Sequence, residues 1–343
     1  GALADAQGHP LRLQEDPWLN NPRRNRCGLV NSLSVSNLPE ETLYYLAFNL
    51  CWEVIGPSRF PQILKYFKSA KAAWLAPDDE YRKFLWGEET LIKFLNLRKN
   101  VNLTTAENRV IKTGVSLLTL ADKDYPSNLR KISDPPFLLY VHGNLQPRDD
   151  LALAIVGSRK MTSYGADVIK SLVPDLTAGG LTIVSGLAFG VDYLAHKVAL
   201  EAGGRVIAVL ASGVDTITPR SNEGLAEAIV KSGRGAVVSE FPLGTEPKDY
   251  YFPFRNRIIS GLSKATLVIE AAEQSGTFHT VRAALDQGRD VFAVPGPIFN
   301  PLSRGPLKLI RDGAKPVVEA RDILEELADG DINAMAAARE ILP

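Results

Sequence analysis

Cysteine is nearly absent from this sequence. The 343 residues contain only Cys27 and Cys51, which lie 24 positions apart (51 − 27) and form no C-x-x-C motif. The sequence therefore predicts neither a disulfide framework nor a zinc site, and it favours a reducing compartment. The four histidines, at positions 9, 142, 196 and 279, also lack the spacing of metal ligands. We expect neither a metal nor another cofactor.

Long apolar runs and a surplus of charge are missing too. No stretch of about 18 apolar residues is present, so no transmembrane helix is predicted. The first residues lack the basic and apolar pattern of a secretion signal, and we expect a cytoplasmic protein. The chain has 39 Lys and Arg against 39 Asp and Glu, a formal net charge of zero. Binding to nucleic acid would therefore require a local basic patch.

Common catalytic and nucleotide-binding motifs are missing as well. No G-x-x-x-x-G-K-[ST] loop occurs, which argues against an ATP site of the P-loop type. G-S-R-K-M-T stands where a dinucleotide-binding fold has G-x-G-x-x-G. Glu240 and Glu270, near expected strand ends, leave an acid–base role open. Capping a helix or pairing with an arginine is the simpler interpretation of both carboxylates, so no catalytic set stands out in the sequence.

Composition divides the chain into four segments. Residues 1–36 are polar and rich in Asn, Pro and Arg, and we expect them to be disordered. Residues 37–112 carry apolar residues at helical spacing and predict a small all-α domain. In this domain, Val54-Ile55-Gly56-Pro57 resembles a helix-hairpin-helix turn, although a plain turn between helices is the simpler explanation. Residues 113–320 form the main domain in this interpretation, and 321–343 form a short helical end.

Short β-branched apolar runs alternate with helical stretches from residue 151 onward. Runs this apolar are typical of strands that are covered on both faces, so we predict an α/β fold with a doubly wound, mainly parallel sheet. Two more strand-like runs, 116–120 and 137–141, precede them. The other expected strands are 151–156, 181–184, 205–210, 236–239, 265–270 and 290–294.

Small residues follow each of the six strands expected from residue 151 onward, which are counted here from 151–156. Gly157-Ser158-Arg159 follows the first, Ser185-Gly186 the second, and Ser275-Gly276-Thr277 comes soon after the fifth. In a parallel sheet such loops meet at the carboxyl edge of the strands, where ligands bind. Glycine lets backbone N–H groups approach a ligand closely, and helix N-termini attract anions. The pattern indicates a phosphate-binding cleft, while tight turns and helix caps explain the same residues without a ligand.

The stretch Y-Y-F-P-F-R-N-R-I-I-S at 250–260 combines aromatic rings with arginines. Single-stranded nucleic acid needs cations for its phosphates and flat side chains on which its bases stack. Arginine serves both purposes, because its plane stacks and its fork pairs with phosphate. The alternative is that the arginines pair with Glu240 or Asp249. Residues with the required chemistry here are Lys248, Phe252, Arg255 and Arg257.

A dense set of motifs runs through residues 116–318. It includes A-I-V-G-S-R-K-M-T-S-Y-G (154–165), S-G-L-A-F-G-V-D-Y-L-A-H (185–196), S-E-F-P-L-G (239–244), F-P-F-R-N-R-I-I-S-G-L-S (252–263) and V-F-A-V-P-G (291–296). Together these motifs resemble those of the DNA processing protein A family, also called DprA or Smf.

The resemblance implies an extended Rossmann-like domain after a helical domain similar to the sterile-alpha-motif (SAM) fold. It also implies a non-enzymatic function: the family binds single-stranded DNA, protects it during natural transformation, and loads the RecA recombinase onto it past single-strand-binding protein. Family members form homodimers through the α/β domain. The DNA contacts that the resemblance implies are Gly157, Ser158, Arg159, Ser185, Gly186, Lys248, Phe252, Arg255, Asn256 and Arg257, with Gly276 and Thr277 lining the cleft by position.

The resemblance has a limit at the C-terminal end, and two other functions stay open. Many family members end in a winged-helix domain, whereas 23 residues (343 − 320) follow Ala320 here, so we expect that domain to be absent or truncated. Lysine-decarboxylase-like phosphoribohydrolases have a G-G-x-G-T loop where this chain has Ser275-Gly276-Thr277, which leaves a nucleotide or phosphoribosyl hydrolase as the alternative. The third hypothesis is a scaffold that acts through protein contacts alone.

Overall fold

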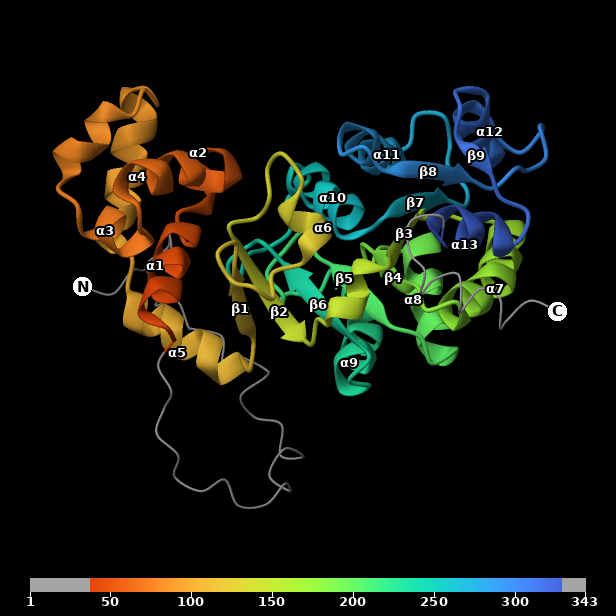
Figure 1. Cartoon of the computed structure of the whole chain (residues 1–343), viewed down its shortest axis with the longest axis horizontal. Coiled ribbons are helices and arrows are strands. Elements are labelled where there is room, and N and C mark those ends of the chain that lie inside the picture. The colour runs from red at the N-terminus through yellow and green to blue at the C-terminus, as the bar shows by residue number, and fades with distance from the viewer. Residues whose placement is uncertain (1–37, 329–343) are drawn as a thin grey trace, which may run out of the picture. The chain divides into compact units, whose positions relative to one another are not determined.

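The structure, a computed structural model, describes residues 38–328 (Figure 1). The polar segment predicted for 1–36, Cys27, and the part of the helical end that follows Ala328 lie outside the described residues. Within residues 38–328, no helix has both the length and the hydropathy needed to cross a bilayer. No group of three or more His, Cys, Asp and Glu side chains in that range is arranged to hold a metal ion.

Helices fill the first part of the described chain. Their core is aromatic: the Phe48 ring lies 5.2 Å from the Phe60 ring and 5.1 Å from the Trp74 ring, measured between centroids. The same buried cluster continues into the sheet through residues such as Tyr140 and Ile155. The elements are α1 (Glu40–Asn49), α2 (Trp52–Phe67), α3 (Ala70–Leu75), the 3-10 helix η2 (Asp78–Lys83), α4 (Glu88–Asn100) and α5 (Leu103–Thr113).

The segment Val54-Ile55-Gly56-Pro57 breaks α2 into two pieces. Gly56 has a φ of 51°, a conformation that glycine adopts without strain, and Pro57 starts the second piece with its fixed φ. Val54, Ile55 and Pro57 are buried. The segment is therefore a bend between two helical pieces whose apolar side chains belong to the core.

A nine-stranded sheet forms the centre of the described chain, in the order β1-β2-β6-β5-β4-β3-β7-β8-β9. The pairs β1–β2 and β2–β6 are antiparallel, and all other neighbouring pairs are parallel. The predicted α/β fold with a mainly parallel sheet is confirmed. The strands are β1 (Ser116–Thr119), β2 (Leu138–Gly143), β3 (Ala152–Val156), β4 (Thr182–Ser185), β5 (Val206–Val209), β6 (Gly235–Ser239), β7 (Ala265–Val268), β8 (Asp290–Ala293) and β9 (Lys315–Pro316).

Helices cover both faces of the sheet (Figure 1). Alternate residues of β3 serve the two faces: Leu153 and Ile155 pack with α7, α8 and α9, while Ala154 and Val156 pack with α6, α10 and α11. This alternation is why the strands read as continuous apolar runs. The helices of this part are α6 (Ser127–Arg130), α7 (Ser163–Ala178), α8 (Val191–Glu201), α9 (Glu223–Lys231), α10 (Tyr251–Leu262), α11 (Thr277–Asp286), α12 (Arg304–Arg311) and α13 (Arg321–Ala328), with the 3-10 helices η3 (Pro147–Asp150), η4 (Arg220–Asn222) and η5 (Pro301–Ser303).

The strand order reverses beside β3. From β3 the chain proceeds outward to β4, β5 and β6, and it then returns through α10 to place β7 on the other side of β3. The loops after β3 and β7 therefore diverge at the carboxyl edge, and such a switch point is where open α/β sheets bind ligands.

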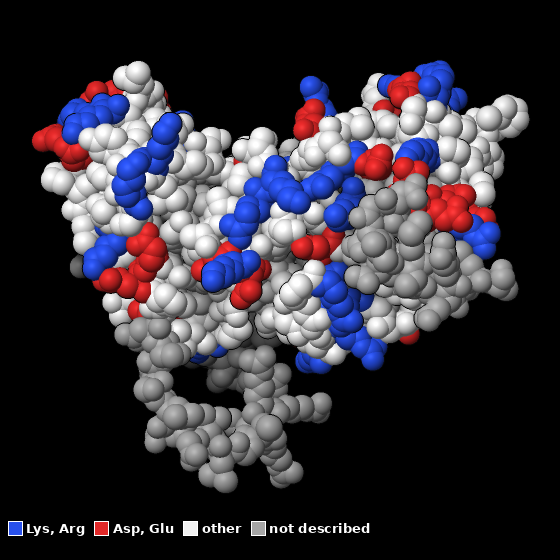
Figure 2. Space-filling view, viewed as in Figure 1, with Lys and Arg blue, Asp and Glu red and all other residues white. Residues whose placement is uncertain are grey.

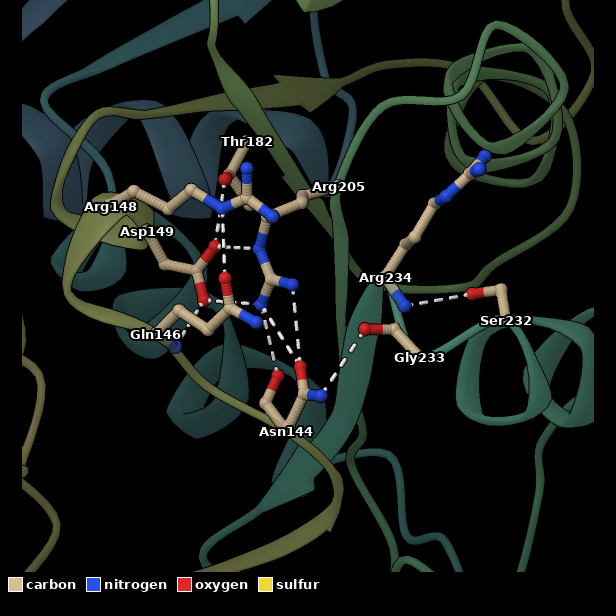
Figure 3. A network of polar contacts seen from close by, with 9 residues as sticks. All are labelled: Asn144, Gln146, Arg148, Asp149, Thr182, Arg205, Ser232, Gly233 and Arg234. Carbon is tan, nitrogen blue, oxygen red and sulfur yellow. Dashed lines mark hydrogen bonds and ion pairs between the residues drawn. The ribbon is translucent and has the colours of Figure 1, made fainter.

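The opposite, amino-terminal edge is held together by a buried ion pair (Figure 3). Arg205 donates from Nε to Oδ1 of Asp149 (2.6 Å) and from Nη2 to Oδ2 (2.7 Å). Asp149 also accepts from Thr182 Oγ1 at 2.8 Å and from the Gln146 backbone N–H at 2.7 Å. Asn144 accepts from Arg205 through its backbone oxygen at 3.0 Å. The network thus joins the starts of β4 and β5 to the loop that precedes β3.

Replacing Arg205 tests this network. Arg205→Ala leaves the Asp149 carboxylate buried without its cation, and we expect the free energy of unfolding to fall by about 3–5 kcal/mol. Lys231→Ala is the matched control, because Lys231 pairs with Glu227 one helical turn away on the exposed surface of α9. That change should cost less than about 0.5 kcal/mol. Urea denaturation of both variants gives the comparison, and equal losses would contradict a stabilising role for the network.

His196 predicts a pH dependence of stability. It is fully buried on α8, and burial lowers its pKa to about 3 from an ordinary value of 6.5. In the unfolded chain, His196 takes up a proton below about pH 6.5, whereas in the folded chain it stays neutral down to about pH 3. The free energy of unfolding therefore falls as the pH drops from 6.5 towards 3. The expected slope from this residue is at most about 1.4 kcal/mol per pH unit.

His196→Met should remove this slope, because Met is apolar and of similar size. Urea denaturation of both proteins between pH 6.5 and 5.5 isolates the contribution of His196, since the other histidines are common to both. Parallel profiles for wild type and variant would show that His196 titrates alike in the folded and unfolded chains.

Candidate nucleic-acid interface

Helix α10 carries the ring-rich stretch that the sequence singled out. Pro253 lies in its first turn, where a missing N–H costs nothing, and Ile258, Ile259 and Leu262 are buried against the sheet. The remaining side chains of α10 point in different directions and make three separate sets of contacts. The rings and arginines of this stretch therefore do not form a single surface.

One set of contacts joins α10 to α2. The Trp52 ring stands edge-on to the rings of Tyr251 and Phe254, with centroids 5.5 and 5.6 Å apart. Trp52 Nε1 also donates to Oε2 of Glu240 at 3.3 Å, and Asn49 Nδ2 donates to the Glu240 backbone oxygen at 2.9 Å. Two of the rings thus hold the start of α2 against α10, and the hydrogen bonds to Glu240 hold the same region against the end of β6.

A second set lies at the carboxyl edge of the parallel strands. The Arg159 guanidinium stands over the Phe252 ring, with its central carbon 5.3 Å from the ring centroid. Arg159 is exposed, and Phe252 is half-buried. Such a cation–ring pair keeps the positive charge available while it orients the side chain. Arg159 comes from the loop after β3, at the switch point of the sheet.

Two glycines near Arg159, one in the loop after β3 and one in the loop after β4, leave no room for a larger residue. A Cβ on Gly157 would lie 2.7 Å from Cγ2 of Val191 and 2.8 Å from the Glu270 backbone oxygen. Gly190 has a φ of 73°, and a Cβ there would lie 2.2 Å from the Ser158 backbone oxygen. The Ser158 N–H donates to the Glu270 backbone oxygen at 2.6 Å. The loops after β3, β4 and β7 are therefore packed backbone against backbone.

Arg255 lies beneath the exposed pair. Its Nη1 donates to the backbone oxygens of Gly186 (2.7 Å) and Val209, at the ends of β4 and β5. Burial lowers the pKa of Arg255 to about 10, which leaves it protonated at neutral pH. The nearby Asp192 carboxylate acts against this lowering of the Arg255 pKa, and burial raises the pKa of Asp192 itself. A Cβ on Gly186 would lie 2.6 Å from the Arg255 guanidinium carbon, so glycine is required for this arrangement.

Arg257 belongs to a third set of contacts. Its Nη2 donates to Glu240 Oε2 at 2.6 Å, its Nε lies 3.0 Å from Asp134 Oδ2, and the residue is only 7% exposed. This is the pairing with Glu240 that the sequence left open. The guanidinium of Arg257 is therefore occupied by carboxylates and does not belong to the exposed surface of this edge.

The other predicted contact residues divide between surface and interior. Ser185 is buried and donates from Oγ to the Ile155 backbone oxygen at 2.6 Å, and Thr277 is buried beside Ser275, 2.9 Å between hydroxyl oxygens. Lys248 is exposed but pairs with Glu53 at 2.6 Å, which raises the pKa of Lys248. The predicted residues that are exposed or half-buried are Gly157, Ser158, Arg159, Lys248, Phe252, Asn256 and Gly276.

The two candidate acid–base carboxylates both have structural partners. Glu270 accepts from the backbone N–H of Thr162 at 2.7 Å and from its Oγ1 at 2.6 Å, which anchors the start of α7. Glu240 is held by Arg257 and Trp52, and its burial raises its pKa. Donors from other elements thus occupy both oxygens of Glu270 and one oxygen of Glu240, whereas Glu240 Oε1 is buried without a hydrogen-bond partner among the described residues.

Sequence reasoning missed two exposed groups at the same edge. Phe189 is 51% exposed in the loop after β4, and Arg220 is exposed at the start of η4. Asn222 Nδ2 donates to the Leu187 backbone oxygen at 2.9 Å, so the two loops are in contact. The sequence did contain a hint of Phe189, because it is the only aromatic residue in S-G-L-A-F-G (185–190), a loop expected at the ligand-binding edge.

Positive charge also gathers elsewhere on this neutral chain. Figure 2 shows a band of Lys and Arg side chains over α6 and α10. Arg130 on α6 and the following Lys131 are both exposed, and Arg289 Nη2 donates to the Asn128 backbone oxygen of α6 at 3.1 Å. Positive charge is thus concentrated locally on this face, although the chain has equal numbers of acidic and basic residues.

The family model "DNA recombination-mediator protein A" matches residues 116–328 of the chain. That range covers the whole sheet and the candidate interface, and it exceeds half of the chain. The chain therefore belongs to the DNA recombination-mediator protein A family, as its motifs predicted.

Individual relatives agree with the family model. Protein Smf of Escherichia coli (strain K12) is 50% identical over 206 residues, which are 60% of this chain and 55% of that protein's length. Protein Smf of Synechocystis sp. is 34% identical over 310 residues, 88% of this chain and 77% of that protein. DNA processing protein DprA of Bacillus subtilis is 42% identical over 220 residues, 64% of this chain and 73% of that protein.

Two solved structures are similar to this one. The X-ray structure of DNA processing protein A from Streptococcus pneumoniae superimposes with a TM-score of 0.72 and 32% identity, covering 85% of this chain and 99% of that one. A structure of DNA processing protein A from Helicobacter pylori, solved for its single-stranded DNA binding mode, gives a TM-score of 0.56 and 27% identity over 63% of this chain and 96% of that one.

Substitutions of the buried Arg257 and the exposed Arg159 should differ in their effect on stability. Arg257→Ala leaves Glu240 buried without its cation, and we expect the free energy of unfolding to fall by about 3–5 kcal/mol. Arg159→Ala removes an exposed side chain and should change that free energy by less than about 0.5 kcal/mol. Urea denaturation of the two variants measures both values. If Arg257→Ala lowered the free energy of unfolding as little as Arg159→Ala, Arg257 would not be needed for folding and could contact a ligand.

Proposed function

We propose that this chain binds single-stranded DNA at the carboxyl edge of its parallel strands and acts there as a recombination mediator. The observation that carries the proposal is the Arg159–Phe252 pair, an exposed guanidinium over a half-buried ring at the switch point of the sheet. A cation for phosphate and a ring for a base are what single strands require. The H. pylori relative, whose structure concerns single-stranded DNA binding, supports the same ligand class.

The proposed contact surface has an exposed layer and a supporting layer. Arg159, Phe252 and Asn256 meet the strand, and the loop at Gly157-Ser158 allows its backbone close to a phosphate. Arg255 and Gly186 lie underneath and fix the loops after β4 and β5, while Arg255 adds a permanent positive charge. Gly276 at the start of α11, with Thr277 behind it, extends the surface on the β7 side.

Lys248 can contact DNA only if a phosphate replaces its present partner, the Glu53 carboxylate. Its ammonium group pairs with Glu53 at 2.6 Å, and both side chains are 46% exposed. An exposed pair of this kind contributes little to stability, so a phosphate can replace the carboxylate at small cost. We therefore expect Lys248 to contact a strand that passes beside α2.

In the wider role that we propose, the protein protects incoming single strands and loads the RecA recombinase onto them during natural transformation. It works as a homodimer joined through the α/β part, single-strand-binding protein is a further partner, and no catalytic step is involved. The support is the family itself, whose name is recombination mediator, and the names of relatives as DNA processing proteins.

Fluorescence anisotropy tests the DNA site. A labelled oligo-dT should bind more tightly than the matching duplex, because a base must leave its stack to meet Phe252. Arg159→Ala should weaken binding roughly tenfold and lower the slope of log K against log salt by about 0.7, since one phosphate contact is lost. Measurements at two salt concentrations give both quantities.

Arg148→Ala is the matched control, because Arg148 is an exposed arginine that precedes β3 and thus lies at the opposite edge. It removes the same charge and should leave binding unchanged. Equal losses in both variants would mean that net charge alone attracts the strand. No binding by the wild type would overturn the proposal, and a nucleoside monophosphate incubation followed by chromatography would then examine the hydrolase alternative.

A further inference from the structure

An exposed phenylalanine stands on the loop after β8. Phe299 is 90% exposed and its neighbour Ile298 is 67% exposed, whereas most rings of the described chain are buried. The loop lies at the carboxyl edge, because β8 is parallel to β7. A ring this exposed contributes almost nothing to folding, since it buries little apolar area.

The loop itself is firmly held. Tyr164 donates from its hydroxyl to the Pro295 backbone oxygen at 2.6 Å, before the ring, and Asn300 accepts from the Leu302 N–H at 2.9 Å, after it. The Ala271 N–H donates to the Leu302 backbone oxygen at 2.8 Å. Phe299 is thus displayed by a loop that is anchored on both sides.

Glu270 links this loop to the proposed DNA site. Its Oε1 lies 3.4 Å from Asn300 Nδ2, its other contacts anchor Thr162, and its backbone oxygen accepts from the Ser158 N–H at 2.6 Å. One residue therefore connects the neighbour of Arg159 with the neighbour of Phe299. The loop that carries Phe299 therefore shares an anchor with the loop of Arg159, whose guanidinium stands over the Phe252 ring.

A free cation accompanies the ring. Arg304, the first residue of α12, is exposed and has no ion pair or side-chain hydrogen bond within residues 38–328. The next residue, Gly305, donates its N–H to the Ala271 backbone oxygen at 2.9 Å, which places the start of α12 beside the loop after β7. Phe299 and Arg304 thus supply an exposed ring and an exposed cation on the β8 side of the same edge, five residues apart in the sequence and without the direct cation–ring contact of Arg159 and Phe252 in the described residues.

We propose that Phe299 and Arg304 form a second stacking platform, on which single-stranded DNA continues after it leaves Arg159 and Phe252. This inference rests on the proposed function and extends its site across the ends of β7 and β8. A base stacks on Phe299, and Arg304 holds the adjoining phosphate. Short strands fill only the first platform, and longer strands reach both.

Anisotropy with oligo-dT of increasing length tests the second platform. Wild-type affinity should rise in two steps as length increases, and Phe299→Ala should remove the second step, with a loss of roughly 5- to 100-fold for long strands only. Arg304→Ala should lower the salt slope by about 0.7 for long strands and leave it unchanged for short ones. Phe299→Tyr should bind like the wild type, and Phe299→Leu like Phe299→Ala, because stacking needs a ring.

Two controls separate the possible failures. Leu85→Ala removes an apolar side chain that is 100% exposed in the helical part and should change nothing. Arg159→Ala should weaken binding at every length, because it belongs to the first platform. If Arg159→Ala weakens binding but Phe299→Ala does not at any length, only the second platform is overturned. If the wild type binds no oligo-dT, both proposals fail.

Direct observation of the ring completes the test. Phe299→Trp keeps a flat ring and adds a fluorophore, whose emission, after subtraction of the wild-type signal, should be quenched by long strands and not by short ones. Quenching at all lengths would overturn the proposal that Phe299 is reached only after the first platform is filled. A change of oligomeric state in Phe299→Ala with unchanged DNA binding would overturn the assignment of this loop to DNA.

Discussion

The return of the chain from β6 to β7 is the constraint on which this structure depends. It creates the switch point beside β3, and it does so through α10, which must cross the sheet with one face buried on it. The residues of α10 that are not needed for that packing are then placed by geometry. Tyr251 and Phe254 pack on Trp52, and Arg257 pairs with Glu240. Phe252 and Arg255 lie at the edge beside Arg159.

Buried carboxylates at strand ends hold the loops of this edge in place. Glu240 follows β6 and ties α10 and α2 together, and Glu270 follows β7 and ties together the loops after β3 and β8. Glu270 accepts hydrogen bonds from another element at both oxygens, and Glu240 accepts from Arg257 and Trp52 at Oε2 alone, so the cost of burying each charge is partly offset. The two carboxylates that suggest an acid–base pair in the sequence therefore hold in place the backbone of the proposed binding surface.

The sequence predicted the sheet well, because apolar runs and glycine loops report burial and turns locally, and its ligand edge stays a prediction. It could not separate Arg255 from Arg257, whose partners come from β4, β5, β6 and the loop at Asp134. Helical geometry did contain part of the answer: residues two apart point about 200° away from each other, so both arginines cannot face one cleft. Phe299 was beyond prediction, since nothing local distinguishes an exposed ring from a core ring. The division into domains at residue 112 stays a prediction.

The ion pair between Lys248 and Glu53 has a consequence for how the helical part and the ligand affect each other. Glu53 lies on α2 and also accepts from the Tyr251 hydroxyl at 2.9 Å, so it binds α2 to the start of α10. A phosphate that captures Lys248 takes away part of that attachment. Thermodynamic linkage is reciprocal, so any partner that pulls α2 from α10 would free Lys248 and strengthen strand binding by the same factor. The helical part would then act as a built-in competitor of the ligand.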